Sequence, residues 1–167
     1  MKRQSHKSVM FLTRGGVIAA LYTALTYLSF LLGLSSGVIQ FRISEALCIL
    51  PIFMPEAILG LTIGCFISNL VTGAFFWDII FGSVATLIGA TGAFLLRGIS
   101  DKLKWIVTLP TILANAIIIP FVLIYAYGVP DGYFFLMFTV GVGEIVCAGI
   151  GGSLLYYTMK KSKFRPL

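Results

Sequence analysis

Hydrophobic residues gather along this chain in long blocks that polar residues rarely interrupt. Four blocks are long enough to cross a membrane as one helix: Gly15 to Leu34, Ile79 to Leu96, Trp105 to Tyr127 and Tyr133 to Met159. Because an α-helix rises about 1.5 Å per residue, roughly 20 residues cross a hydrocarbon core of about 30 Å. The pattern predicts four full spans. The first is retained rather than cleaved, since it exceeds the apolar core of a usual signal peptide.

A fifth apolar block, Ser44 to Leu70, has a different character. It would rise only about 40 Å if wholly helical, too little for two full crossings, and Pro51 and Pro55 disfavour a continuous helix. Two short helices joined near Pro51 to Glu56 satisfy both constraints, provided that neighbouring helices shelter the break. We therefore expect an all-α membrane protein, a six-transmembrane-helix bundle whose second and third helices are short and broken.

Composition agrees with an integral membrane protein. Of 167 residues, 59% are hydrophobic and only 11% are charged. The mean hydropathy of +1.02 leaves too little polar surface to cover a soluble domain of this size. No repeat, linker or low-complexity stretch divides the chain, so we expect residues 1–167 to form a single integral membrane domain.

The net charge of +6 comes mainly from basic residues at the edges of the apolar blocks. They lie in two tails, about residues 1–14 and 160–167, and in the short loop from Arg97 to Lys104. Such flanks usually face the cytoplasm, so we expect both termini to be cytoplasmic. Basic flanks also suit anionic lipid headgroups, and their placement argues against nucleic acid as the partner. With this orientation, the segment from Leu34 to Asp78 begins and ends outside and crosses an even number of times.

Few polar side chains interrupt the apolar blocks, and ionisable groups inside a membrane are candidates for binding. The candidates are Arg42, Glu45, Asn69, Asp78, Asn115 and Glu144. Counted along the predicted spans, Glu144 and Asn115 lie near mid-membrane and the others lie nearer the outer side. Aromatic residues gather in the same half, among them Phe41, Trp77 and Tyr125. An outward-facing pocket of this composition suits a flat, polar heterocycle.

Structural roles stay open for most of these residues. Arg42 and Glu45, three positions apart, could pair on one helix face, and Asp78 could cap the helix that follows it. Asn115 could form a hydrogen bond between helices. Glu144 has no such simple role, because at mid-membrane it must be paired, protonated or bound.

The chain carries no signature of an enzyme. It has one histidine, in the basic tail, three scattered cysteines, and neither a Walker motif nor a Ser-His-Asp set. We therefore expect no catalytic residue, no metal site and no cofactor. Any ATP-driven step would require another chain.

Small residues point to a close contact between helices. Gly16, Ala20 and Ala24 follow one another at four-residue spacing in the first span, and Gly60 and Gly64 form a second pair. Such stripes permit close approach of two backbones. The stripe on the first span could pack within the bundle or dock another membrane protein.

Three stretches carry a resemblance to a known family: VIQFRISEALCILP, GLTIGCFISNLVTG and DIIFGSVATLIGA, starting at residues 38, 60 and 78. In this order they resemble the QueT family of substrate-binding S-components of energy-coupling-factor (ECF) transporters. The resemblance implies a six-helix bundle in the bacterial plasma membrane, with short second and third helices. It also implies two kinds of partner: a queuosine precursor of the 7-deazaguanine type (preQ0, preQ1 or queuine), and a transmembrane coupling protein with two cytoplasmic ATPases. In S-components the small residues of the first helix form the docking surface, here Gly16, Ala20 and Ala24.

No ligand residue is carried over from the family, so the ligand roles follow from chemistry alone. A deazaguanine edge offers adjacent N–H donors that a carboxylate accepts in pairs, and we assign this edge to Glu45 or Glu144. Asn69, Asn115 or Arg42 would contact the carbonyl oxygen. Asp78 would meet an aminomethyl ammonium if the ligand has one, and aromatic rings would stack on the base.

Three alternatives to this function stay open, and the first of them belongs to the same class. The chain could be an S-component for another vitamin, because the scaffold is shared while pockets diverge. It could be a solitary proton-coupled carrier with Glu144 as its proton site. It could also be an assembly subunit with no ligand.

Overall fold

The structure, a computed structural model, describes residues 2–35 and 39–162, and only the main chain of residues 2–7. Across these residues every regular element is helical. Four helical segments are long and apolar enough to cross a membrane, and two apolar helices are shorter. The long segments are Ser8–Leu31, Phe76–Gly98, Asp101–Tyr125 and Tyr133–Lys161, and the short ones are Ile43–Ile52 and Glu56–Val71. The all-helical class, the four long spans and the two short helices are thus confirmed, while the number of crossings stays a prediction.

The first helix, α1 (Lys2–Leu31), begins well before its apolar block. The residues that we assigned to a basic tail extend it, since Lys, Arg, Gln and Met are good helix formers. The helix ends at a glycine with a left-handed backbone, Gly33 at φ 70°. The Gly33 and Leu34 amides donate to the carbonyls of Phe30 and Ser29, which is the hydrogen-bond pattern of a Schellman motif.

The fifth apolar block is broken where its prolines predicted. It forms η1 (Ile43–Ile52), a 3₁₀ helix of 10 residues that contains Pro51, and α2 (Glu56–Val71), which follows Pro55. A 3₁₀ helix of this length is uncommon. Two hydroxyls of α1 hold its first turn: the Ile43 amide donates to Ser29 Oγ at 3.0 Å, and Thr26 Oγ1 lies 2.7 Å from Ser44 Oγ.

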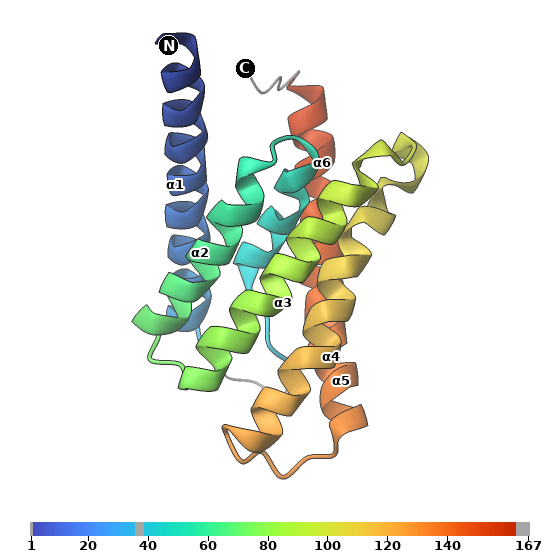
Figure 1. The fold of residues 1–167 in the computed structure, drawn as a ribbon. Helices are drawn as coiled ribbons and strands as arrows, with labels where there is room; N and C mark the ends of the chain where they lie inside the picture. The colour runs from blue at the N-terminus through green and yellow to red at the C-terminus, as the bar shows by residue number, and fades with distance from the viewer. Residues whose placement is uncertain (1, 36–38, 163–167) are drawn as a thin grey trace.

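The rest of the chain forms three long helical segments, each antiparallel to the one before it. The last segment ends at the same end of the bundle as the start of α1 (Figure 1). In order, the elements of these segments are α3 (Phe76–Leu95), η2 (Leu96–Gly98), η3 (Asp101–Thr108), α4 (Leu109–Tyr125), α5 (Tyr133–Glu144), η4 (Ile145–Gly151) and α6 (Gly152–Lys161). The last three continue one another without a break. Because η4 is a π-helix, the last span changes its winding midway.

Short η1 lies in the middle of the bundle (Figure 1), in contact with α1, α2, α3, η4 and α6. This position explains why most of its residues are buried although the helix is short. Helix α1 stands at the edge of the bundle and packs on α2 and η1. The start of α1 and the end of α6 lie at the same end of the molecule (Figure 1).

Two ion pairs join helices at the end where the described chain starts and finishes. Arg14 Nη1 lies 3.1 Å from Glu56 Oε1, which ties α1 to the start of α2. Lys160 Nζ lies 2.6 Å from Asp101 Oδ2, which ties α6 to η3. Glu56 is therefore engaged in an ion pair at this end of the bundle.

The small residues of α1 lie on two different faces. Gly15 and Ala19 pack against Gly60 and Gly64 of α2, where a Cβ on Gly64 would stand 2.8 Å from the Cβ of Tyr22. This contact requires glycine. Gly16, Ala20 and Ala24 lie on the exposed side of α1 instead, and a Cβ on Gly16 would meet nothing within 4 Å. The stripe that the sequence singled out therefore faces away from the bundle.

Candidate polar cavity

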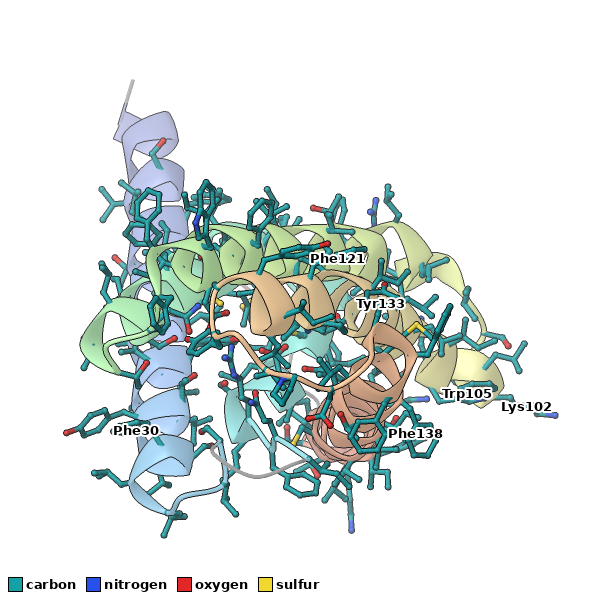
Figure 2. All side chains as sticks on the ribbon, turned by 90° about the horizontal axis from the view of Figure 1, so that it is seen from below. Phe30, Lys102, Trp105, Phe121, Tyr133 and Phe138 are labelled. Carbon is teal, nitrogen blue, oxygen red and sulfur yellow. The ribbon has the colours of Figure 1, made fainter. Side chains whose placement is uncertain are left out.

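A cavity of about 380 Å³ lies at the end of the bundle opposite the basic loop and the ends of the described chain. Figure 2 looks onto this end, where Phe30 marks α1, Phe121 marks α4 and Tyr133 marks α5. Polar side chains from five parts of the chain line the cavity, together with apolar ones from α1 and α4. They include Thr26, Phe30, Gln40, Arg42, Asn69, Thr72, Asp78, Ile119, Leu123 and Tyr127.

Asp78 lies in the first turn of α3 and interacts with three other residues of the cavity wall. Its Oδ2 accepts a hydrogen bond from the Tyr127 hydroxyl at 2.9 Å, and Arg42 Nη2 lies 3.7 Å away. Asn69 Nδ2 donates to the Asp78 main-chain oxygen at 3.2 Å. The other carboxylate oxygen, Oδ1, is buried and has no hydrogen-bond partner among the described residues. Asp78 therefore presents one unused acceptor.

Tyr127 fixes the position of this carboxylate from the loop after α4. Its hydroxyl donates to Asp78 and accepts a hydrogen bond from the Phe75 amide at 3.3 Å. Burial, and then the nearby Asp78 carboxylate, raise the pKa of the Tyr127 hydroxyl above its ordinary value. The tyrosine consequently stays protonated, and able to donate, throughout the neutral range.

Glu45 lies in η1, deeper than the cavity wall, and only 2% of its surface is exposed. The Tyr22 hydroxyl donates a short hydrogen bond to Oε1, and the Cys48 thiol lies 3.2 Å from Oε2. Both carboxylate oxygens are thus engaged by neighbours on α1 and η1. This carboxylate is placed to hold η1 against α1.

Glu144 and Asn115 form a second deep pair, on α5 and α4. They are 8% and 5% exposed, and Asn115 lies beside the Glu144 carboxylate. Neither Glu144 Oε2 nor Asn115 Nδ2 finds a hydrogen-bond partner within the described part of the chain. Glu144 is the last residue before the π-helix η4, and π-helical turns inside α-helices are frequent at functional sites.

Next to this pair, α5 touches the segment that leads into η1. A Cβ on Gly143 would collide with the main-chain carbonyl of Gln40, a residue of the cavity wall. Glycine is therefore required at position 143. The contact places the deep pair directly behind the wall of the cavity.

The structure distributes the predicted site residues over three places. Arg42, Asn69 and Asp78 line the cavity, and Phe41 is half-buried beside Arg42. Glu45, Asn115 and Glu144 are buried beneath the cavity without lining it. The local alternatives for two of them do not hold, because Arg42 pairs with Asp78 rather than Glu45, and Asp78 makes no capping bond at the start of α3.

Trp77 and Tyr125 do not line the polar cavity. They border a separate apolar cavity of about 600 Å³ between α3 and α4, with Phe81 and Phe121. Successive residues of a helix point about 100° apart, so Trp77 faces outward where its neighbour Asp78 faces inward. The aromatic residues that the sequence placed around the ligand therefore lie mainly on the outer surface of the bundle.

The candidate site residues did not include three residues that line the cavity: Tyr127, Thr26 and Gln40. One signal was present: Tyr22, Thr26 and Ser29 are polar and recur at helical spacing in the first span, and all three are buried. A polar stripe on an otherwise apolar helix faces protein rather than lipid. For Tyr127 no such pattern exists, because it lies in a loop.

The sequence model of the QueT transporter family matches residues 12–161. The chain belongs to the QueT transporter family. It is therefore a multi-pass membrane protein of a transporter family. Over 73 residues it is 44% identical to the queuosine precursor transporter QueT of Lactococcus lactis subsp. cremoris (strain MG1363). This match covers 43% of the chain and 42% of that relative, less than half of either. No solved structure matches the chain.

Proposed function

We propose that this chain is the S-component, the substrate-binding membrane subunit, of an ECF-type importer. It would capture a queuosine precursor of the 7-deazaguanine type outside the cell and deliver it inward when coupled to ATPase subunits. The single observation that carries this proposal is the polar cavity, where Asp78 offers an unpartnered acceptor. Family membership and the printed function of the Lactococcus relative support the substrate class.

The orientation of the cavity supports capture from outside. The basic loop around Lys102 and the basic end of α6 lie together at the end opposite the cavity. Basic ends of membrane bundles favour the cytoplasm. With that end of the bundle in the cytoplasm, the cavity would open outward in the plasma membrane of a bacterium.

The deep pair suits the edge of a deazaguanine ring. Asn115 lies about 15 Å below the outer end of α4 and one helical turn beneath Ile119, which lines the cavity. Glu144 Oε2 offers an acceptor and Asn115 Nδ2 offers a donor, and both lack partners in the described residues. A ring edge with N–H groups beside a carbonyl oxygen supplies the complementary set. This makes Glu144, rather than the fully engaged Glu45, our first choice for the donor edge.

Binding by the purified protein tests the ligand. A 7-deazaguanine should raise its melting temperature and bind in isothermal titration. Glu144→Gln should weaken binding about tenfold or more, because the new amide presents an N–H to a ligand donor and a charge-assisted hydrogen bond is lost. Asp101→Asn, which removes a carboxylate at the opposite end, is the control and should bind normally. Absence of any heterocycle-dependent shift in the wild type would reject the proposal.

The exposed small-residue face of α1 supports the proposal that the chain binds a transmembrane coupling protein. We assign Gly16, Ala20 and Ala24 to docking of the transmembrane coupling protein, because a helix of that protein could approach closely there. Ala20→Trp should reduce co-purification of the ATPase subunits at least about fivefold and leave ligand binding unchanged. Val84→Trp places the same side chain on an exposed position of α3 and should have no effect.

Co-purification also separates this proposal from a solitary proton-coupled carrier. The buried, unpartnered Oε2 of Glu144 is the observation that favours such a carrier. A carrier of that kind would purify without ATPases and continue uptake when ATP hydrolysis is blocked. An S-component would lose uptake under the same block.

A further inference from the structure

We propose that the cavity selects a heterocycle carrying a positive charge, and that Asp78 is the residue that holds this charge. The inference deepens the proposed function and rests on it. The inference is about the substituent that the ring carries. The proposed role of Glu144 and Asn115 is instead to bind the edge of the ring.

The Asp78 carboxylate has one buried oxygen that no described residue satisfies. The residue lines the cavity and is 5% exposed. Tyr127 donates to Oδ2, and Arg42 approaches the same oxygen at 3.7 Å, beyond hydrogen-bond distance. Oδ1 has no partner among the described residues. Because an unsatisfied buried carboxylate oxygen is unfavourable, a donor on the ligand would stabilise the site.

The charge balance around the cavity favours a cationic donor over a neutral one. Three carboxylates are buried in this part of the bundle, on Asp78, Glu45 and Glu144. Arg42 is the one Lys or Arg of the sequence between Arg14 and Arg97, and the ion pairs of Arg14 and Lys160 belong to the opposite end. Excess buried charge is costly inside a membrane domain. A monocationic ligand reduces the excess, and a neutral ligand leaves it unchanged.

A primary alkylamine meets both requirements. Like a lysine side chain, it is protonated at neutral pH, and its ammonium is a compact charge with three donors. Asp78 lies near the outer end of α3, about 3 Å below its first residue, whereas Asn115 and Glu144 lie about 15 Å down their helices. The amine would therefore point toward the mouth, with the ring edge directed to the deep pair.

Two ligands with the same ring test this inference on the full chain purified in detergent. One is 7-aminomethyl-7-deazaguanine, which is cationic, and the other is 7-cyano-7-deazaguanine, which is neutral. Isothermal titration at neutral pH should show the amine binding about tenfold tighter or more, as charge-assisted hydrogen bonds allow. Asp78→Asn should weaken the amine about tenfold and change the nitrile less than about threefold. Asp101→Asn should change neither.

Each outcome decides between the two proposals. Equal affinities for the two ligands, a preference for the nitrile, or an Asp78→Asn variant that weakens both alike would overturn the charge inference and leave deazaguanine capture standing. Binding of neither ligand by the wild type would overturn both. The comparison in the wild type needs no substitution, so it decides the question even if Asp78→Asn does not fold.

Discussion

Arg42 and Asp78 come from different elements and meet at the edge of the cavity, with Arg42 Nη2 3.7 Å from Asp78 Oδ2. Their side chains are 19% and 8% exposed. A pair this deep contributes little net stability when intact, because desolvation offsets the attraction, yet removal of one partner leaves the other charge unpaired. The pair is therefore better suited to fixing a binding geometry than to stabilising the fold.

This reasoning predicts a coupled mutational effect. Arg42→Met should destabilise the protein by about 3 kcal/mol, because Asp78 then stays buried without its counter-ion. The double variant Arg42→Met/Asp78→Leu should recover most of this loss, because neither charge remains. Thermal unfolding of the purified protein in detergent measures both. If the double variant were less stable than Arg42→Met alone, the coupling would be refuted.

Helices α1 and α2 approach closely along a row of small residues, and this contact positions a polar residue of the core. Tyr22 lies between the contact and Glu45, to whose carboxylate its hydroxyl donates. A change in the distance between α1 and α2 would thus shift Tyr22 and alter its hydrogen bond to Glu45 of η1, in the centre of the bundle. The exposed face of α1, by contrast, is free to change without such an effect.

Equivalent substitutions on the two faces should differ in consequence. In Gly64→Ala the new Cβ would lie 2.8 Å from Tyr22 Cβ and 2.9 Å from the Ala19 carbonyl oxygen, so we expect a loss of about 1 to 3 kcal/mol. In Gly16→Ala the new Cβ meets nothing within 4 Å, and stability should hold or rise, because alanine is the better helix former. Thermal unfolding of the two variants provides the comparison. Equal melting temperatures would contradict the packing described here.

At the scale of the whole molecule, the sequence predicted the elements better than the site. Lengths of apolar blocks and the two prolines suffice for four long spans and a broken segment, because a membrane core sets helix length and proline interrupts helices. They do not determine how neighbouring helices are rotated and aligned. For this reason the sequence named Arg42 and Asp78 but not their pairing, and it placed Trp77 and Tyr125 at the ligand when they border another cavity.

The orientation of the bundle yields a prediction for intact cells. The three native cysteines are buried, so they should contribute little background to labelling with a membrane-impermeant thiol reagent. Asp131→Cys, in the exposed loop between α4 and α5, should be labelled from outside. Lys102→Cys, in the exposed turn at the opposite end, should be labelled only after permeabilisation. The reverse pattern would place the cavity on the cytoplasmic side.

The contact between Gly143 and the Gln40 carbonyl joins two main chains, and main chains have no rotamers with which to adapt. Substitution of side chains therefore cannot widen the distance between the last span and the segment before η1 at this contact. A larger substrate would need extra space elsewhere in the cavity. The α4 side of the cavity can provide it, because Ile119 and Leu123 can be replaced by smaller side chains. Relatives that transport substrates of different size should therefore differ mainly in the cavity-lining side chains of α4.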